Sequence, residues 1–282
     1  MKRPTIPLML LIAASIFVFF LLNLLLGSVS IPIGSVWNIL WGGTDESVIW
    51  QNIIWKSRVP QALTALVAGA GLSISGLQMQ TVFRNPLAGP SVLGISSGAS
   101  LGVAFVVLLS GAFGGVALSK LGYMGEVALS LAAVIGALSV MALIVYVSQK
   151  VKGNVTLLII GVMIGYVANA VIGVLKFFSV EEDIRAYVIW GLGSFARVSG
   201  NQMTLFVILM TVLIPLSFLL IKTMNLMLLG DSYARNLGLN IKRARLLVIT
   251  SAGVRTAIVT AYCGPIIFLG LAVPHLCRAI FQ

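Results

Sequence analysis

The sequence predicts an all-α membrane protein, a polytopic bundle of about eight transmembrane helices that forms one domain over residues 1–282. Of the 282 residues, 59% are apolar and only 9% are charged, and the mean hydropathy is +1.10. A soluble domain carries about 25% charged residues, so this chain lacks the polar surface that a water-soluble globule needs. Its apolar runs are continuous and approach the roughly 20 residues that cross a bilayer as a helix. Because lipid offers no partner to backbone groups, we expect helices in these runs.

The expected spans follow one another along the whole chain, and one long connection separates the first two. This connection, Gly27–Arg58, contains four of the five tryptophans, which is typical of a segment at a membrane interface. The last span is unusually short and begins at Gly264-Pro265, where a helix should break. The predicted spans are Ile6–Leu26, Ala62–Phe83, Val92–Leu109, Val127–Ser148, Val155–Phe178, Met203–Ile221, Leu246–Tyr262 and Pro265–Val273.

The distribution of charge predicts the orientation of the bundle. With the N-terminus inside, eleven lysines and arginines face the cytoplasm, six face outward, and Arg255 lies within a span. This excess of basic residues inside favours a cytoplasmic location for both termini. The net charge of +11 therefore indicates membrane topology, and we expect no nucleic-acid partner.

Small residues recur at every fourth position of the fifth span. Gly161, Gly165, Asn169 and Gly173 share one helix face, and such stripes mostly allow helices to pack closely in lipid. Asn169 adds a polar group that needs a partner or water, so this stripe is also the best candidate for lining a translocation path.

Arg255 is the charged residue predicted deep inside a span, and no acid in the spans can pair with it. A charge at this depth costs at least about 2.5–3.5 kcal/mol on insertion scales. Two interpretations remain open: the guanidinium meets an anionic substrate in a wet cavity, or it binds backbone carbonyls or snorkels toward an interface.

Several kinds of chemistry have no motif here. The chain has no phosphate-binding loop of the Gly-x-x-x-x-Gly-Lys type, no metalloprotease motif and no Cys-x-x-Cys pair. We therefore expect no enzyme, no metal site and no cofactor bound by this chain. Few carboxylates are available for an intramembrane proton relay, so any energy source should be a partner protein.

The loop between the sixth and seventh spans predicts a short docking helix. Asp231 or Ser232 can cap its start, Tyr233 and Leu237 share one face, and Gly238 can end it. Such a short helix is unstable alone, so it should rest either on the membrane surface or on a cytosolic partner.

Six motifs, in order along the chain, resemble the FecCD-type permease family of bacterial ABC importers, which carry iron chelates, haem or cobalamin. The resemblance covers most of the chain and is specific for the family, but it does not select a substrate. The motifs are Arg58-Val-Pro, Gly69–Gly76, Phe83–Ala88, Leu93–Ala99, Gly230–Asn240 and Cys263–His275.

This resemblance implies a ten-helix permease subunit in the plasma membrane. It would pair with a second permease subunit as a homodimer or heterodimer. Two cytosolic ATPase subunits, which use Mg-ATP, would sit beneath, and a substrate-binding protein would dock outside. Family members continue with two further helices where this chain ends at Gln282. We therefore expect eight of ten spans, and a truncated or non-functional permease is one alternative.

The resemblance also assigns roles to residues at matching positions. Residues 230–240 resemble the segment that couples the permease to its ATPase. Arg58 resembles a basic residue that meets an acid of the binding protein, although Gln61 stands where the family often has a second arginine. The implied site residues are Gly230, Asp231, Ala234, Arg235, Leu237 and Gly238 for coupling, Arg84, Asn85 and Pro86 at the inner face, and Gly161, Gly165, Asn169, Gly173 and Arg255 along the path.

The predicted function is alternating access driven by partner ATPases. The rival classes are a secondary carrier or channel, which would need neither ATPase nor binding protein, and a purely structural membrane subunit.

Overall fold

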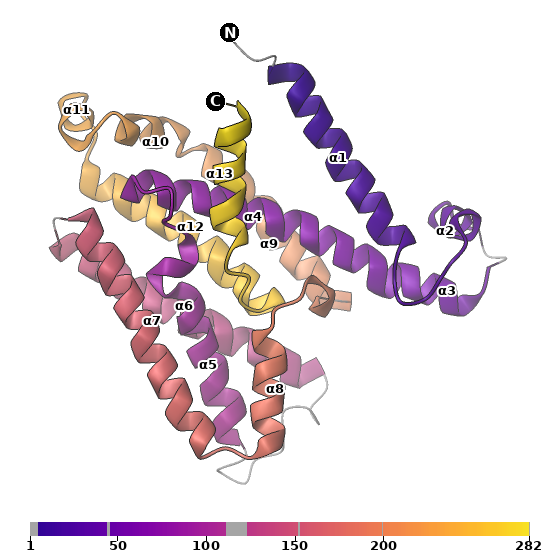
Figure 1. Ribbon diagram of the computed structural model, residues 1–282. Coiled ribbons are helices and arrows are strands. Elements are labelled where there is room, and N and C mark those ends of the chain that lie inside the picture. Colours follow the sequence, from indigo (N-terminus) through magenta and orange to yellow (C-terminus); the bar gives the residue numbers. More distant parts are fainter. Residues whose placement is uncertain (1–4, 44–45, 111–122, 152, 199, 282) are drawn as a thin grey trace.

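The computed structural model describes residues 5–43, 46–110, 123–151, 153–198 and 200–281, and these residues form a helical bundle (Figure 1). The beginning of α1 and the end of α13 lie on the same side of the molecule as α11, whereas α8 lies at the opposite end. The α-helices are α1 Thr5–Leu25, α2 Ile33–Leu40, α3 Val48–Ile53, α4 Val59–Phe83, α5 Ile95–Ser110, α6 Tyr123–Lys150, α7 Asn154–Phe177, α8 Glu181–Gly191, α9 Gly200–Phe218, α10 Ile221–Leu228, α11 Asp231–Asn236, α12 Ile241–Cys263 and α13 Leu269–Phe281.

The helices correspond in order to the predicted apolar segments. Five of them, counting α3 and α4 as one, are long and apolar enough to cross a membrane, and α9 with α10 forms a sixth candidate bent by 49°. The shorter apolar helices α5 and α13 match the two remaining segments. The all-α bundle is therefore confirmed, whereas the number of spans stays a prediction.

The prediction for the last segment was wrong in its position. A helix was expected over Pro265–Val273, but residues 265–268 are not helical and α13 extends over Leu269–Phe281. Gly264 follows α12 with a φ of +78°, a conformation that ends the helix and turns the chain. The apolar run thus contains the turn as well as the start of the next helix.

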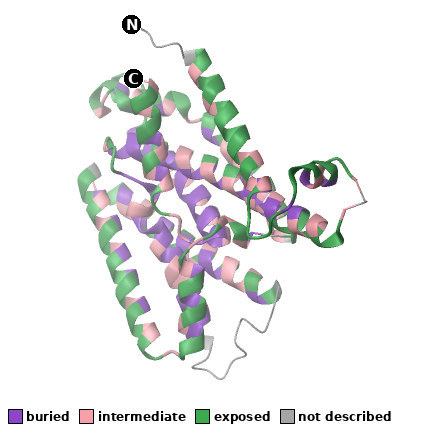
Figure 2. Ribbon diagram, turned by 45° about the vertical axis from the view of Figure 1, so that its right-hand side comes forward, coloured by how far each residue is buried: buried purple, intermediate pink, exposed green. Residues whose placement is uncertain are grey.

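The buried residues lie mainly in the middle of the bundle (Figure 2), and the long helices α4 and α12 contribute many of them. In α12, 61% of the most apolar stretch is buried, against 6% in α1, which lies at the periphery. Because lipid provides no hydrophobic drive between helices, an exposed apolar helix such as α1 is compatible with a membrane setting.

Small residues allow close packing between α5 and α6. A Cβ atom added to Gly102 would lie 2.2 Å from the carbonyl oxygen of Ala132, and one added to Gly136 would lie 2.1 Å from that of Gly98. Real Cβ atoms do not approach so closely, so the two backbones touch because these positions carry no side chain.

The predicted soluble connection 27–58 contains more helix than expected. The short helix α2 precedes α3, which continues through a π-helical turn, Ile54–Arg58, directly into α4. Residues 48–83 consequently form one continuous helix. Trp37 of α2 and Trp41, which follows the end of α2, contact each other and are exposed, as expected for side chains at an interface.

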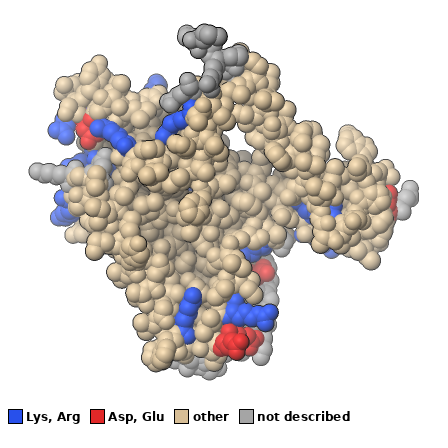
Figure 3. Space-filling model, in the orientation of Figure 1, with Lys and Arg blue, Asp and Glu red and all other residues tan. Residues whose placement is uncertain are grey.

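Charged side chains gather beside α11 and around α8, and a wide uncharged surface lies between them on the face shown in Figure 3. This distribution suits a protein whose middle lies in lipid and whose ends lie in water.

Candidate functional site

The predicted docking helix is present as α11, bounded by two glycines with positive φ. Gly230 has a φ of +112° and Gly238 one of +85°, values that strain any residue with a Cβ atom. Gly238 ends the helix as predicted, with its N–H donating to the carbonyl of Arg235 at 2.9 Å. The predicted side-chain cap was wrong: Gly230 is at the cap position, and neither Asp231 nor Ser232 caps the helix.

One small residue attaches α11 to the bundle. Ala234 is fully buried, whereas Tyr233 and Leu237 are 57% and 54% exposed. The pair predicted to share a face therefore points outward, as two apolar side chains on a helix only six residues long. Exposed apolar residues on a tethered helix are suited to contact a partner or the membrane surface.

An arginine at the end of α4 joins α11 to the bundle. Arg84 adopts a left-handed conformation with a φ of +47° and ends α4. Its guanidinium donates to the carbonyl of Met227 at 3.0 Å and to a carboxylate oxygen of Asp231. The motif Phe83–Ala88 and the motif Gly230–Asn240, which are separate in the sequence, therefore meet. Asn85 turns the chain after Arg84 by accepting a hydrogen bond from the Leu87 N–H at 2.9 Å, and Pro86 follows it.

A third member of this cluster was missed by sequence reasoning. Arg245 of α12 is buried, and its guanidinium lies 3.7 Å from the second carboxylate oxygen of Asp231. Its sequence signal was only a place among the basic residues at the start of α12. We call Arg84, Asp231 and Arg245 the inner cluster, and it connects α4, α11 and α12 through one carboxylate.

The stripe on α7 has two different halves. Gly161 and Gly165 are buried, and a Cβ atom on Gly161 would lie 2.8 Å from the Cα atom of Leu93, so this half packs against the chain before α5. Asn169 is exposed, and a Cβ atom on Gly173 would meet nothing within 4 Å.

The same stripe borders a groove of about 270 Å³. Ser91, Ser96 and Ser97 line it from the segment before α5 and from α5 itself, and Asn169 and Tyr166 line it from α7. The lining is mainly apolar, and the serines and Asn169 add a few polar groups to it.

Arg255 lies inside the bundle among neutral acceptors. Its side chain is 1% exposed, and its guanidinium donates to Ser251 Oγ at 2.9 Å, to Ser75 Oγ at 3.2 Å and to Gln78 Oε1. A longer bond of 3.4 Å reaches the carbonyl of Leu213 in α9. Arg255 thus ties α4, α9 and α12 together, and it is absent from the residues that line the α7 groove. Its role toward a substrate stays a prediction.

Arg58 differs from the expected surface position. It is 5% exposed, and its guanidinium donates to the carbonyls of Leu24 and Leu25 at 2.7 and 2.9 Å and to that of Val29. These bonds satisfy carbonyl groups at the end of α1, which no helical partner can reach. A contact with a binding protein would require Arg58 to leave them, and this role stays a prediction.

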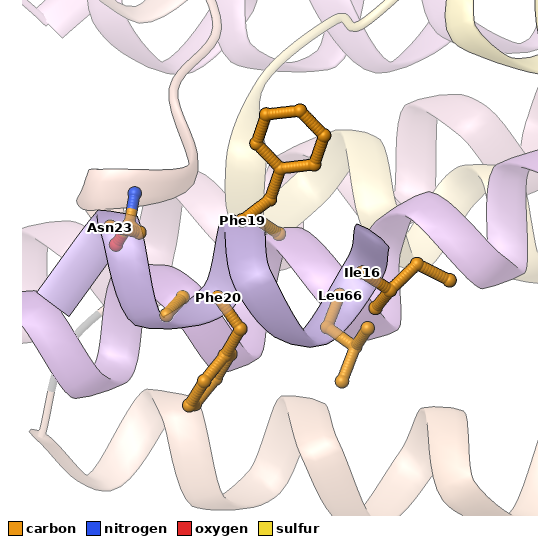
Figure 4. Close-up of a pocket in the computed structure, with 7 residues that line it drawn as sticks. Ile16, Phe19, Phe20, Asn23 and Leu66 are labelled. Carbon is orange, nitrogen blue, oxygen red and sulfur yellow. The ribbon is translucent and has the colours of Figure 1, made fainter. Parts of the chain in front are cut away.

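A further cavity of about 400 Å³ lies between α1 and α4 and is mainly apolar (Figure 4). Phe19, Phe20 and Ile16 line it from α1, and Leu66 faces it from α4. It carries no charged group, in contrast to the inner cluster, and belongs to the loosely packed side of α1.

Comparisons with known proteins support the geometric picture. Residues 15–282 match the model of the FecCD transport family. A vitamin B12 import system permease protein BtuC of Serratia proteamaculans is 34% identical over 250 residues, which cover 88% of this chain and 71% of that protein. A hemin transport system permease protein HmuU of Yersinia pestis is 33% identical over 256 residues, covering 90% and 72% of the two chains.

A solved structure shows the same arrangement of helices. It is described as an inward-facing conformation of a metal-chelate type ABC transporter and superposes with a TM-score of 0.80 at 27% identity, covering 97% of this chain and 82% of that one.

Proposed function

Because this chain belongs to the FecCD transport family, we propose that it is the membrane-spanning permease subunit of an ABC importer for an iron-siderophore, haem or cobalamin-type chelate. Relatives in this family are transport subunits and not enzymes. ATP hydrolysis with Mg²⁺ then takes place in a partner subunit, and this chain contributes the path and the coupling surface.

The inner cluster is the observation that supports this function most directly. It joins α11, which exposes Tyr233 and Leu237, to the ends of the central helices α4 and α12. A push on α11 from a cytosolic ATPase would therefore reach the centre of the bundle through Asp231. A secondary carrier or channel has no need of such an exposed helix.

The remaining partners follow from the same proposal. A second permease subunit, identical or related, would face the groove beside α7 and complete the path along Gly161, Gly165, Asn169 and Gly173. A substrate-binding protein would dock on the α8 side, which is extracytoplasmic if both termini lie in the cytoplasm of a bacterial cell.

Co-purification tests the coupling role of α11. The chain is expressed with the cytosolic ATPase of its own transport system, and retention of the ATPase is measured for the wild type and for Tyr233→Asp/Leu237→Asp. We expect the double variant to lose the ATPase, because two charges replace the apolar contact surface. Leu192→Asp is the matched control, since Leu192 is 76% exposed at the opposite end of the molecule.

A reconstitution experiment separates the proposal from its rivals. Liposomes with the permease and its ATPase should take up the chelate when ATP is supplied, and liposomes with the permease alone should not. Uptake by this chain alone would establish a carrier or channel instead.

A further inference from the structure

A cavity at the α8 end of the molecule carries buried polar groups that the proposed transport function does not use. It has a volume of about 500 Å³ and lies among α5, α6, α8 and the short helix Phe195–Arg197. This size is within the usual range for small-ligand sites. It lies far from α11, at the opposite end in Figure 1.

The inward face of α8 presents two polar groups without partners. Asp183 is 5% exposed and Trp190 is 2% exposed, and both line the cavity. The Oδ2 atom of Asp183 accepts no hydrogen bond, and the indole Nε1–H of Trp190 donates none. Buried polar groups are nearly always paired, so each unpaired group indicates a missing partner.

Tyr187, between these two residues, already has partners for its ring. Its ring contacts that of Trp190 with centroids 6.5 Å apart, and the ammonium group of Lys176 lies 4.9 Å from its ring centroid. The unpaired groups of Asp183 and Trp190 therefore lie on the same face of α8, with Tyr187 between them. They lie seven residues apart on one helix, a rise of about 10 Å.

The charges on the other wall of the cavity compensate one another. Glu126 accepts a hydrogen bond from Gln202 at 3.0 Å. Burial lowers the pKa of Arg197, and the negative charge of Glu126 opposes this shift. Glu126 and Arg197 thus balance each other at one side.

Two exposed charged residues of α8, Glu182 and Arg185, also line the cavity, but neither forms an ion pair with Asp183. Within the described residues, both ion pairs belong to Asp231, and no cation lies within ion-pair distance of Asp183. The cavity therefore requires a positive donor near Asp183 and an acceptor near Trp190, with apolar contact along Leu129 and Ile189.

We propose that this cavity binds a lysine side chain of an extracytoplasmic protein, with the ammonium group on Asp183 and the adjoining peptide carbonyl on the indole N–H of Trp190. An extended lysyl residue measures on the order of 8 Å from its ammonium nitrogen to its carbonyl oxygen. It can bridge the two groups with one hydrogen bond at each end. This assignment rests on the orientation proposed above, which places the α8 end outside the cytoplasm, and it does not depend on an ATPase partner.

Equilibrium binding to the purified full chain tests the assignment. The probe is Nα-acetyl-lysine methylamide, followed by tryptophan fluorescence because Trp190 lies in the site. We expect a saturable change that is absent in Trp190→Phe. The norleucine analogue keeps the four side-chain carbons without the ammonium group, and it should bind at least about tenfold more weakly, as expected for loss of a charged hydrogen bond.

Matched variants locate the site. Asp183→Asn keeps the shape of the side chain and removes its charge, so we expect binding to weaken by about tenfold or more. Glu181→Gln removes an exposed acid of the same helix that does not line the cavity and should bind as the wild type does. Circular dichroism and gel filtration of Asp183→Asn verify that the bundle is intact.

A second probe distinguishes a peptide lysine from a free amine. Butylamine carries the ammonium group without a carbonyl, so it should bind several-fold more weakly than the lysine probe. Equal binding of butylamine, equal binding of the norleucine analogue, unchanged binding by Asp183→Asn, or no saturable change with any probe would each overturn the proposal. The last outcome is the one expected if water alone fills the cavity.

Discussion

Arg255 and the inner cluster hold their arginine charges in different ways. Arg255 is 1% exposed and donates to neutral oxygens of Ser75, Gln78 and Ser251. In the inner cluster, Arg84 is paired with the carboxylate of Asp231, and both side chains are about 40% exposed.

We infer that Arg255 is a fixed contact and that the inner cluster is a contact that can break and re-form. Removing one partner from a buried charge leaves a desolvated group, which is strongly destabilising. Exposed ion pairs contribute little to stability, so they can break and form as a segment moves. The centre of the bundle should therefore depend on Arg255 for stability, and α11 should depend on the inner cluster for transmission of motion.

The largest expected effect is that of Arg255→Met. It removes a charge-assisted network, and we expect the free energy of unfolding to fall by about 3 kcal/mol, measured by detergent-induced unfolding in mixed micelles. Arg84→Met is the matched control and should cost less than about 1 kcal/mol. Equal losses for the two variants would erase the distinction between the clusters.

A smaller loss is expected for Gln78→Leu. This change leaves Arg255 in place without one of its acceptors, so the same measurement should show a fall of about 2 kcal/mol. Gln149→Leu, at an exposed position near the end of α6, should leave stability unchanged. If Gln78→Leu behaves like its control, the bond between Gln78 and Arg255 does not stabilise the fold.

Asp231→Asn should affect transport far more than stability. We expect a loss of about 1 kcal/mol, well below that of Arg255→Met: the pair with Arg84 is about 40% exposed, whereas the buried Arg245 loses a partner that lies 3.7 Å away. ATP-driven uptake in liposomes with the ATPase should fall by about tenfold, since the link between α11, α4 and α12 loses its charge. Glu181→Gln serves as the control for loss of an acid, and a normal uptake rate in Asp231→Asn would exclude the inner cluster from coupling.

Ionic strength gives the smallest and most selective effect. Raising the salt from about 0.1 to about 1 M shortens the Debye length from about 10 to about 3 Å. The stability difference between wild type and Asp231→Asn should then shrink, whereas the deficit of Arg255→Met should persist because its site is buried. Detergent-induced unfolding at the two salt concentrations measures both differences, and a salt-dependent Arg255→Met deficit would contradict the comparison.

The sequence predicts the helices well, because an apolar run long enough to cross lipid has one structural solution. It predicts positions less well where a turn is itself apolar, as at Pro265–Phe268, and it does not anticipate that residues 48–83 form one helix. Small-residue stripes indicate close packing, but they do not say which partner is approached; Gly98 meets Gly136 of another helix.

The site is only partly predictable for a related reason. The motif residues Arg84 and Asp231 were both identified, yet 147 positions separate them and no periodicity relates them. The absence of an acid in the spans showed that Arg255 needs some other partner. It did not show which one, because the partners come from three helices. On α7, the spacing grouped four residues, whereas packing divides them into two buried glycines and an exposed half.

The continuous helix that contains α4 gives the molecule a mechanical property. Its segment Val59–Phe83 has 25 residues and is about 37 Å long, with Arg58 before one end and Arg84 after the other. A stiff rod turns a small rotation into a large displacement: pivoting by about 10° at one end moves the other by about 6 Å. The π-helical turn at Ile54–Arg58 is the natural place for such a rod to bend. A displacement of the helix at the α11 end would therefore cause motion near α1 and α2, at its opposite end.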